Sequence, residues 1–277
     1  MSALAWGRRY LLCPPDHYEV AYEINPWMHR DVSVDADAAR RQWDGLVTAL
    51  TEAGAAVELI EPVAGLPDMV FTANGAAVDG WRCVQSRFLH PERGPEAEHF
   101  GRWFADHGYE IRHLPPTAHL EGAGDVLPFG RRLLGGYRSR SDFAGQTALA
   151  QLLDLEVLPV ELVDPRFYHL DLSFCPLDDR RALVVPEAWD RYGRQVVEAL
   201  VPEPIVLEPD EAASFCANAV VVGSTVLLPA STSRLDGVLR GLGFDIGVVP
   251  VGEFLKAGGG VRCLTLALDV SLAETAS

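Results

Sequence analysis

Hydrophobic and polar residues follow two periods along this chain, and one period gives way to the other five times. Each time, a stretch with apolar residues three or four positions apart leads into a short apolar segment, which is typical of a helix followed by a strand. The helical stretches are 35–54, 96–108, 141–154, 187–200 and 231–243, and the strands after them are 55–60, 109–114, 155–160, 203–207 and 244–251. The pattern predicts five helix–strand pairs.

The first helical stretch carries the clearest signals. Its apolar residues at helical spacing are Ala39, Trp43, Leu46, Val47 and Leu50. Asp35 stands where an N-cap residue is expected, and Gly54 where a glycine commonly ends a helix. We therefore expect an amphipathic helix between these two residues.

Further strand patterns lie between the helix–strand pairs. They cover 69–78, 124–136, 169–177 with 181–186, and 217–229. Each repeat then reads strand, strand, helix, strand, and the repeats recur at intervals of about 40 to 50 residues. One such unit cannot bury its own apolar face, whereas five units closed into a ring with helices outside can. An open doubly wound sheet is the alternative, but the first strand-to-helix turn lacks its glycine-rich phosphate loop.

Length and composition are those of an ordinary globular protein, and we expect one domain over residues 1–277. The chain is 48% hydrophobic and 22% charged, with a net charge of −16. An acidic surface repels phosphate backbones, so nucleic acid is not an expected partner. It attracts cationic small molecules. A homo-oligomer is compatible with this composition.

The sequence also bears on location. The N-terminal MSALAWGRRYLLCPPD has no apolar stretch long enough for a signal peptide, and no segment approaches the roughly 18 apolar residues of a membrane span. We expect a cytoplasmic protein that does not enter membranes. The cysteines are odd in number, widely spread and without a CxxC pair, so neither a disulfide framework nor a zinc site is predicted. They are Cys13, Cys83, Cys175, Cys216 and Cys263.

Polar clusters recur near the start of the first strand of most repeats. They lie at 24–28, 67–74, 119–125, 168–171 and 216–219, and a last cluster, GGGVRC, lies at 258–263. In a ring these positions converge on the axis. Because residues i and i+2 of a strand share a face, His169 and Asp171 are expected side by side on the wall of a central cavity.

Three residue types in these clusters suggest nucleophilic chemistry. Cys263 follows three glycines, and a nucleophilic thiol needs such exposure together with a neighbouring base. Each residue also has a structural alternative. Cys263 could be a buried core cysteine, and Glu121 could lie in a solvated turn beside its glycines. His169 could have a purely structural role. Their joint occurrence at equivalent ring positions favours an active site.

Taken together, CPPDHYEVAYEINPWM, PDMVFTAN, EGAGD, HLDLSFCPL and GGGVRC resemble the guanidine-modifying (amidinotransferase, or pentein) superfamily, in particular its dimethylargininase-like and arginine dihydrolase-like members. The resemblance extends from Cys13 to Cys263. It implies an α/β fold, a five-bladed propeller of ββαβ units around a central active-site channel. It also implies a hydrolase that cleaves guanidino C–N bonds through a covalent thiouronium, without metal or cofactor.

The resemblance further implies roles for individual residues. Cys263 matches the nucleophile, His169 the general acid/base, and Glu121 the carboxylate that orients this histidine. Asp171 matches the carboxylate that binds the guanidinium. Further substrate-binding residues are expected at Asp68, Asn25, Arg87 and Arg138, where the two arginines would hold the substrate α-carboxylate and Arg140 is a rival for Arg138.

Asn74 distinguishes branches of the superfamily. Many deiminases and dimethylargininases have Asp at this place, whereas Asn resembles the arginine dihydrolase-like branch, which forms ornithine, carbon dioxide and ammonia. A dihydrolase is therefore the preferred interpretation. The alternatives are a dimethylargininase, an arginine deiminase, an amidinotransferase, a non-catalytic binding propeller, and a metal enzyme using His169, Asp171 and Cys263.

Overall fold

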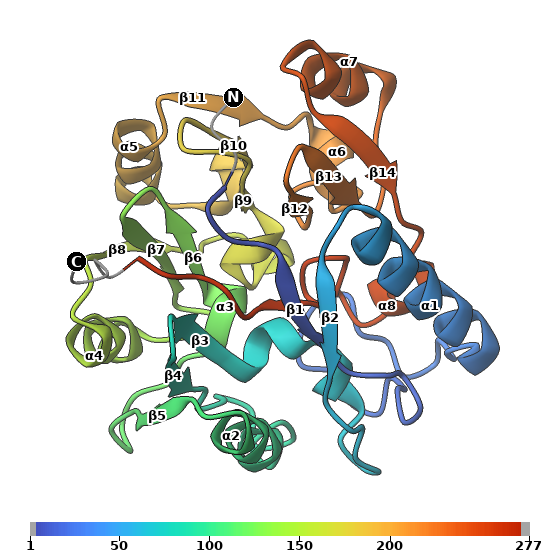
Figure 1. The fold of residues 1–277 in the computed structure, drawn as a ribbon, viewed down its shortest axis with the longest axis vertical. Helices are drawn as coiled ribbons and strands as arrows, with labels where there is room; N and C mark the ends of the chain where they lie inside the picture. Colours follow the sequence, from blue (N-terminus) through green and yellow to red (C-terminus); the bar gives the residue numbers. More distant parts are fainter. Residues whose placement is uncertain (1–3, 273–277) are drawn as a thin grey trace.

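A computed structural model describes residues 4–272, and the outermost residues of the expected domain 1–277 lie outside this range. Within it, five three-stranded sheets surround a common centre (Figure 1). The five-bladed ring expected from the sequence repeats is confirmed. The sheets are β15-β1-β2, β3-β4-β5, β6-β7-β8, β9-β10-β11 and β12-β13-β14.

All five sheets have the same internal order. The central strand pairs antiparallel with the inner strand and parallel with the outer one. The strands are β1 (Arg9–Leu12), β2 (Ala56–Leu59), β3 (Ala76–Asp79), β4 (Arg82–Gln85), β5 (Glu110–His113), β6 (Val126–Phe129), β7 (Arg132–Tyr137), β8 (Val157–Glu161), β9 (Phe174–Pro176), β10 (Arg181–Val184), β11 (Glu203–Val206), β12 (Val220–Val222), β13 (Thr225–Leu228), β14 (Asp245–Val248) and β15 (Leu266–Ala267).

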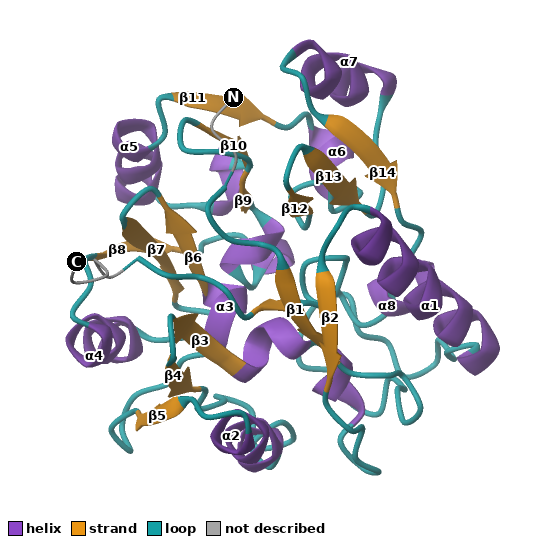
Figure 2. Ribbon diagram, viewed as in Figure 1, coloured by secondary structure: helices purple, strands orange, loops and turns teal. Residues whose placement is uncertain are grey.

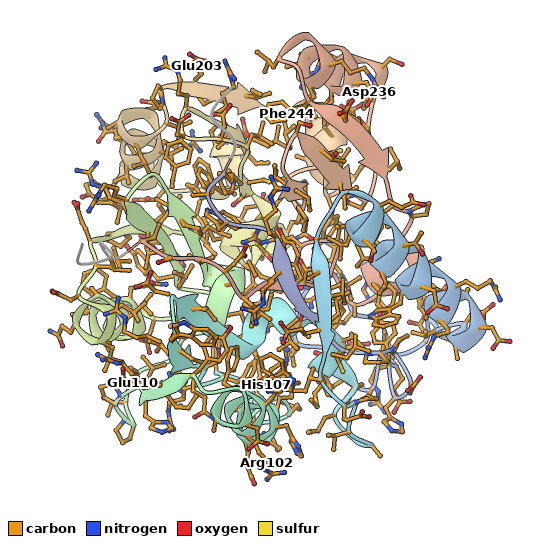
Figure 3. All side chains as sticks on the ribbon, in the orientation of Figure 1. Arg102, His107, Glu110, Glu203, Asp236 and Phe244 are labelled. Atoms are coloured by element: carbon orange, nitrogen blue, oxygen red, sulfur yellow. The ribbon has the colours of Figure 1, made fainter. Side chains whose placement is uncertain are left out.

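Five longer helices lie at the periphery of the ring (Figure 2). They are α1 (Ala36–Glu52), α2 (Glu96–Asp106), α4 (Phe143–Leu153), α5 (Arg191–Leu200) and α7 (Ser233–Gly241). Shorter helices are α3 (Gly122–Asp125), α6 (Pro209–Ala213) and α8 (Gly252–Leu255), and 3₁₀ turns occur at η1 (Pro67–Val70), η2 (Thr72–Gly75), η3 (Pro165–Phe167), η4 (Leu170–Leu172) and η5 (Pro186–Ala188). Side chains labelled in Figure 3, such as Glu203 and Asp236, lie at the outer edge of the molecule.

The long helices begin where side-chain caps allow it. Asp35 accepts a hydrogen bond from the Ala38 amide at 2.9 Å, as its predicted role as N-cap of α1 requires. Gly54 follows α1 with a φ of +95°, a conformation that residues with a Cβ rarely adopt. The predicted bounds of α1 are therefore confirmed.

The ring is closed by pairing the two ends of the chain. β15 aligns antiparallel to β1, with Tyr10 opposite Ala267 and Leu11 opposite Leu266. Their side chains are almost completely buried. Because Cys263 precedes β15 by only three residues, this closure fixes the segment that carries it.

Three segments expected as strands form helical turns instead. Residues 72–75 form η2, residues 124–125 are the end of α3 (Gly122–Asp125), and residues 170–172 form η4, so their strands begin only after these turns. His169 is extended but precedes η4, which is closed by the bond from the Ser173 amide to the Leu170 carbonyl at 2.9 Å. The expectation that His169 and Asp171 share one face of a strand was therefore wrong. Likewise, only Leu266 and Ala267 form a strand in the apolar segment after Cys263.

Candidate active site

The helical turns at the starts of the blades pack directly on one another near the centre of the ring. A Cβ on Gly124 would lie 2.2 Å from Nδ2 of Asn74 and 3.5 Å from the ring of His169. Only glycine allows this approach between α3, η2 and the segment before η4. The glycines of EGAGD therefore bring Asn74, Glu121 and His169 together.

Glu121 joins His169 to an arginine. Its Oε2 atom lies 2.8 Å from Nε2 of His169 and 3.0 Å from Nη1 of Arg140, and Glu121 is completely buried. Burial alone would raise the pKa of Glu121, but Arg140 and His169 lower it well below its usual value. An ionised carboxylate therefore fixes the orientation of the imidazole.

Cys263 lies against Asp171 and Asn218. Its Sγ atom is 3.3 Å from Oδ2 of Asp171 and 3.1 Å from Nδ2 of Asn218. Oδ1 of Asn218 accepts the amides of Arg262 and Cys263, at 2.9 and 3.2 Å, and Nδ2 also donates to the Asp171 carbonyl at 3.1 Å. Asn218 thus fixes the position of Cys263, the candidate nucleophile, relative to Asp171.

The protonation states at this pair depend on burial. Burial, followed by the charge of Asp171, raises the pKa of the Cys263 thiol well above its ordinary value. Burial also raises the pKa of Asp171, to about 7, although the hydrogen bond from Cys263 opposes this. The empty site therefore disfavours the thiolate. A cation bound beside Asp171 would favour both ionised forms.

A second buried network surrounds Asn74. Arg93 donates from Nη1 to Oδ1 of Asn74 at 2.8 Å and from Nη2 to Oε2 of Glu96 at 2.8 Å, and its Nε lies 3.7 Å from Oδ2 of Asp68. Burial raises the pKa of Glu96 to about 7 and also raises the pKa of Asp68. Because Asn74 accepts from Arg93, its Nδ2 faces the Glu121 carbonyl at 3.5 Å.

Two positions of the loop 258–260 leave no room or no allowed conformation for a side chain. Gly258 has a φ of +80°, and a Cβ on Gly259 would lie 2.2 Å from the ring of Phe71. The hydroxyl of Tyr168 donates to the Gly258 carbonyl at 3.0 Å, and Nδ2 of Asn25 donates to the Ala257 carbonyl at 3.0 Å. The loop is thus held on both sides, and Asn25 lies beside it.

Three buried carboxylates of this region each keep one oxygen without a hydrogen-bond partner in the described part of the chain. They are Oδ1 of Asp68, Oε1 of Glu121 and Oδ1 of Asp171. Buried acceptors of this kind are costly unless they are satisfied, so each unused oxygen in a native protein needs an explanation. A cation with several N–H donors would satisfy such acceptors.

Two arginines expected to hold the substrate α-carboxylate lie outside the buried cluster. Arg87 is exposed, and its backbone pairs with Leu120. Arg138 is also exposed and forms an ion pair with Glu161 at 2.5 Å. Arg138 has a φ of 100°, and its amide donates to the Ser141 carbonyl, so the chain turns and directs Arg140 inward. Of the two candidates, Arg140 is therefore the one that reaches the buried cluster, where it pairs with Glu121.

Sequence reasoning missed two residues of this cluster. Arg93 is almost completely buried, although it follows an exposed loop. Its position three residues before Glu96, with which it pairs, is the sequence feature that could have indicated an ion pair. Asn218 lies in the CANA cluster at 216–219, where the cluster but not the residue was singled out. The remaining expected residues, Asp68, Asn74, Glu121, His169, Asp171 and Cys263, are all buried.

Two further features concern metal sites and membrane spans. In residues 4–272, no group of three or more His, Cys, Asp or Glu side chains is arranged to hold a metal ion. Among the same residues, the helices are too short or too polar to cross a membrane.

Comparison with known proteins places this fold and cluster in a family. No family model matches the sequence. The chain is 45% identical over 263 residues to the bifunctional arginine dihydrolase/ornithine cyclodeaminase of a Nostoc species, covering 93% of this chain but 37% of that protein. It is 41% identical over 260 residues to the N(G),N(G)-dimethylarginine dimethylaminohydrolase of Mycobacterium tuberculosis, covering 94% of this chain and 85% of that protein.

Solved structures agree with these relatives. The N-terminal domain of a cyanobacterial arginine dihydrolase, in a cysteine-to-serine variant bound to substrate, has a TM-score of 0.92 and 40% identity, covering 96% of this chain and 99% of that one. The chain therefore belongs to the guanidine-modifying, or pentein, superfamily. Within it, the relatives of this chain include an arginine dihydrolase and a dimethylarginine dimethylaminohydrolase. The chain spans little more than a third of the Nostoc relative, 37% of its length.

Proposed function

We propose that this protein is a hydrolase that converts L-arginine into ornithine, carbon dioxide and two ammonia. The observation that carries the proposal is the contact of 3.3 Å between the Cys263 thiol and Asp171, whose other oxygen has no partner among the described residues. A guanidinium bound by that oxygen would bring its central carbon to the thiol, and its charge would favour the thiolate.

The first hydrolytic step follows from this arrangement. The Cys263 thiolate attacks the guanidinium carbon, and His169, oriented by Glu121, donates a proton to the departing ammonia. A covalent thiouronium remains. His169 then takes a proton from water, which attacks the same carbon, and the thiolate departs. The product of this step is citrulline.

The second step would repeat this sequence on citrulline. Cys263 attacks the ureido carbon, a second ammonia departs, and the S-carbamoyl enzyme is hydrolysed to a carbamate that releases carbon dioxide and ornithine. Asn74 supports this proposal because it is neutral, so the site holds one negative charge less than with Asp. A neutral ureido group can then be retained.

Other residues would bind the remainder of the substrate. We propose that Asp68 and Asn25 line the site and that Arg140 and Arg93 supply its positive charge, in place of Arg138 and Arg87. Arg140 pairs with Glu121 at 3.0 Å and Arg93 with Asn74 at 2.8 Å. Both arginines can offer further N–H donors to a substrate carboxylate.

The comparisons support a dihydrolase and leave one alternative. Structures of the cyanobacterial arginine dihydrolase include an asparagine-to-serine variant covalently bonded to a reaction intermediate, with 40% identity to this chain. The Mycobacterium tuberculosis relative, 41% identical, favours dimethylarginine as the alternative substrate, giving citrulline and dimethylamine. We prefer dihydrolase activity over dimethylargininase activity because of Asn74.

We further propose that residues 1–277 act as a single propeller domain in the cytoplasm. A reducing compartment keeps the thiol of Cys263 available. The expected partner is a small guanidino compound, and association of identical copies is compatible with the fold.

Product analysis tests the proposal. Purified protein is incubated with L-arginine, and citrulline, ornithine and ammonia are measured separately. Ornithine with two ammonia per arginine is the expected result. Citrulline alone would overturn the second step, and turnover of dimethylarginine in place of arginine would establish the alternative.

A further inference from the structure

A buried arginine beside the candidate nucleophile has no partner for its charge. Arg262 immediately precedes Cys263 and is 4% exposed. Its Nε atom is buried without a hydrogen-bond partner, and no carboxylate oxygen of residues 4–272 lies within 4.0 Å of its guanidinium. The buried Arg93 and Arg140, by contrast, both pair with carboxylates. A charge buried in this way is costly unless an opposite charge compensates it.

Two contacts fix the position of Arg262. Its amide donates to Oδ1 of Asn218 at 2.9 Å. Its guanidinium lies over the ring of Trp6, 5.3 Å from the centroid, in a cation–π geometry. Such a contact offsets only part of the cost of burying a full charge. The indole therefore orients the guanidinium but does not replace a counter-charge.

The carboxylates of neighbouring segments are engaged elsewhere. Asp269 accepts two backbone amides of the segment before β1, at 2.9 and 2.7 Å. Asp171 directs its Oδ2 atom to the thiol of Cys263 at 3.3 Å. Neither carboxylate forms an ion pair with Arg262, so the described part of the chain supplies no counter-charge in contact with this arginine.

Arg262 lines a small cavity between the sheets β15-β1-β2, β3-β4-β5 and β6-β7-β8. The other described residues that line it are all apolar, and among them are Ala77, Val126, Leu133 and Ala267. The space that a water-sized molecule can occupy is about 20 Å³. This is enough for one water molecule or one monatomic ion and too small for an arginine substrate.

A water molecule and an anion have different requirements in such a cavity. A buried water typically makes about three hydrogen bonds, and its own hydrogens need acceptors, which apolar side chains do not offer. A halide ion needs only donors, and it brings the missing negative charge. The N–H groups of a guanidinium are such donors. We propose that this cavity binds one monovalent anion of the size of chloride against Arg262.

Thermal unfolding of substrate-free protein tests this inference. Chloride is exchanged for gluconate at constant ionic strength, because gluconate is too large for the cavity. For a dissociation constant of about 10 mM, about 200 mM chloride should raise Tm by roughly 4 °C relative to gluconate. Arg262→Met removes the charge and the donors and should abolish this difference. Arg180→Met removes an exposed arginine paired with Glu203, and as the matched control it should keep the difference.

Bromide locates the anion without any substitution. Wild-type crystals soaked in bromide should show an anomalous peak within hydrogen-bond distance of the Arg262 guanidinium, beside Ala77 and Ala267. Neither this measurement nor the unfolding experiment needs turnover, so both decide the question even if the proposed function fails.

Three results would overturn the inference. The first is a wild-type Tm that does not respond to chloride, and the second is an equal response in wild type and in folded Arg262→Met. The third is the absence of a bromide peak at Arg262, which would assign the cavity to water. If Arg262→Met does not fold, the bromide experiment and the wild-type response decide.

Discussion

The Sγ atom of Cys263 lies 3.3 Å from Oδ2 of Asp171, and both side chains are almost completely buried. Asp171 makes the thiolate of Cys263 less favourable, because two negative charges would meet, whereas the neutral thiol donates to Oδ2 and favours the ionised carboxylate. A guanidinium bound at this pair removes the conflict. In the proposed mechanism, the bound substrate thus activates Cys263, whose thiol stays protonated until a cation binds.

The first prediction concerns the pH dependence of stability. Asp171 has a folded-state pKa of about 7, above its ordinary value, so folded protein binds this proton more tightly than unfolded protein does. The corresponding stabilisation is present at low pH and is lost as pH rises through 7. Asp171→Asn should raise the unfolding free energy at pH 8 by on the order of 2 kcal/mol, and by roughly half of that or less at pH 5, because only part of the window between 3.8 and about 7 has been crossed there.

Urea unfolding of ligand-free protein at both pH values measures this difference. Asp179→Asn, at an exposed position, is the control. Equal effects of Asp171→Asn at pH 5 and pH 8 would show that the carboxyl group does not titrate as described.

Asn218 is expected to position Cys263. Asn218→Ala leaves two buried amides, those of Arg262 and Cys263, without their acceptor and removes the donor to the thiol. We expect a loss of stability of about 2 kcal/mol and a fall in kcat of roughly a hundredfold. Steady-state kinetics and thermal unfolding measure both, and kcat within twofold of wild type would refute this role.

The two neighbouring arginines should differ sharply. Arg140→Met removes the partner of Glu121, raises the pKa of that carboxyl group and should reduce kcat/KM by at least about a hundredfold. Arg138→Met removes an exposed pair with Glu161 and should change kcat/KM by less than about twofold. The reverse order in a product assay would restore Arg138 as the site arginine.

The glycine loop should tolerate no side chain at its centre. Gly259→Ala places a Cβ 2.2 Å from the ring of Phe71 and should destabilise the protein by about 2 kcal/mol or more. Gly237→Ala in α7 meets nothing within 4 Å and should stabilise by roughly 0.5 to 1 kcal/mol. Thermal unfolding compares them, and similar melting temperatures would contradict the packing described for the loop.

The sequence predicts the outer parts of this fold better than its centre. The long helices follow the apolar stripe and caps such as Asp35, which are local signals. Near the axis, η4 and α3 are set by long-range contacts, such as the bond from the Leu170 amide to Oδ1 of Asp125 at 3.1 Å. The residues around η4 alternate between polar and apolar as in a strand, which explains why the turn at 170–172 was missed.

The site residues also differ in whether local sequence patterns or long-range contacts determine them. Cys263, His169, Glu121 and Asp171 stand out because their residue types and motifs carry chemistry. Arg140 differs from Arg138 only through the turn between them, which no local pattern reveals. Buried ion pairs join residues far apart in the chain, so sequence reasoning can list such arginines but cannot choose among them.

The central claim is that Cys263 forms a covalent bond with the guanidino carbon. Wild type, His169→Ala and Cys263→Ala are mixed with L-arginine, quenched in acid and measured by intact-protein mass spectrometry, with peptide mapping of any adduct. We expect an adduct on Cys263 in wild type or His169→Ala and neither adduct nor turnover in folded Cys263→Ala. An adduct on another residue, or wild-type turnover by Cys263→Ala, would contradict the mechanism.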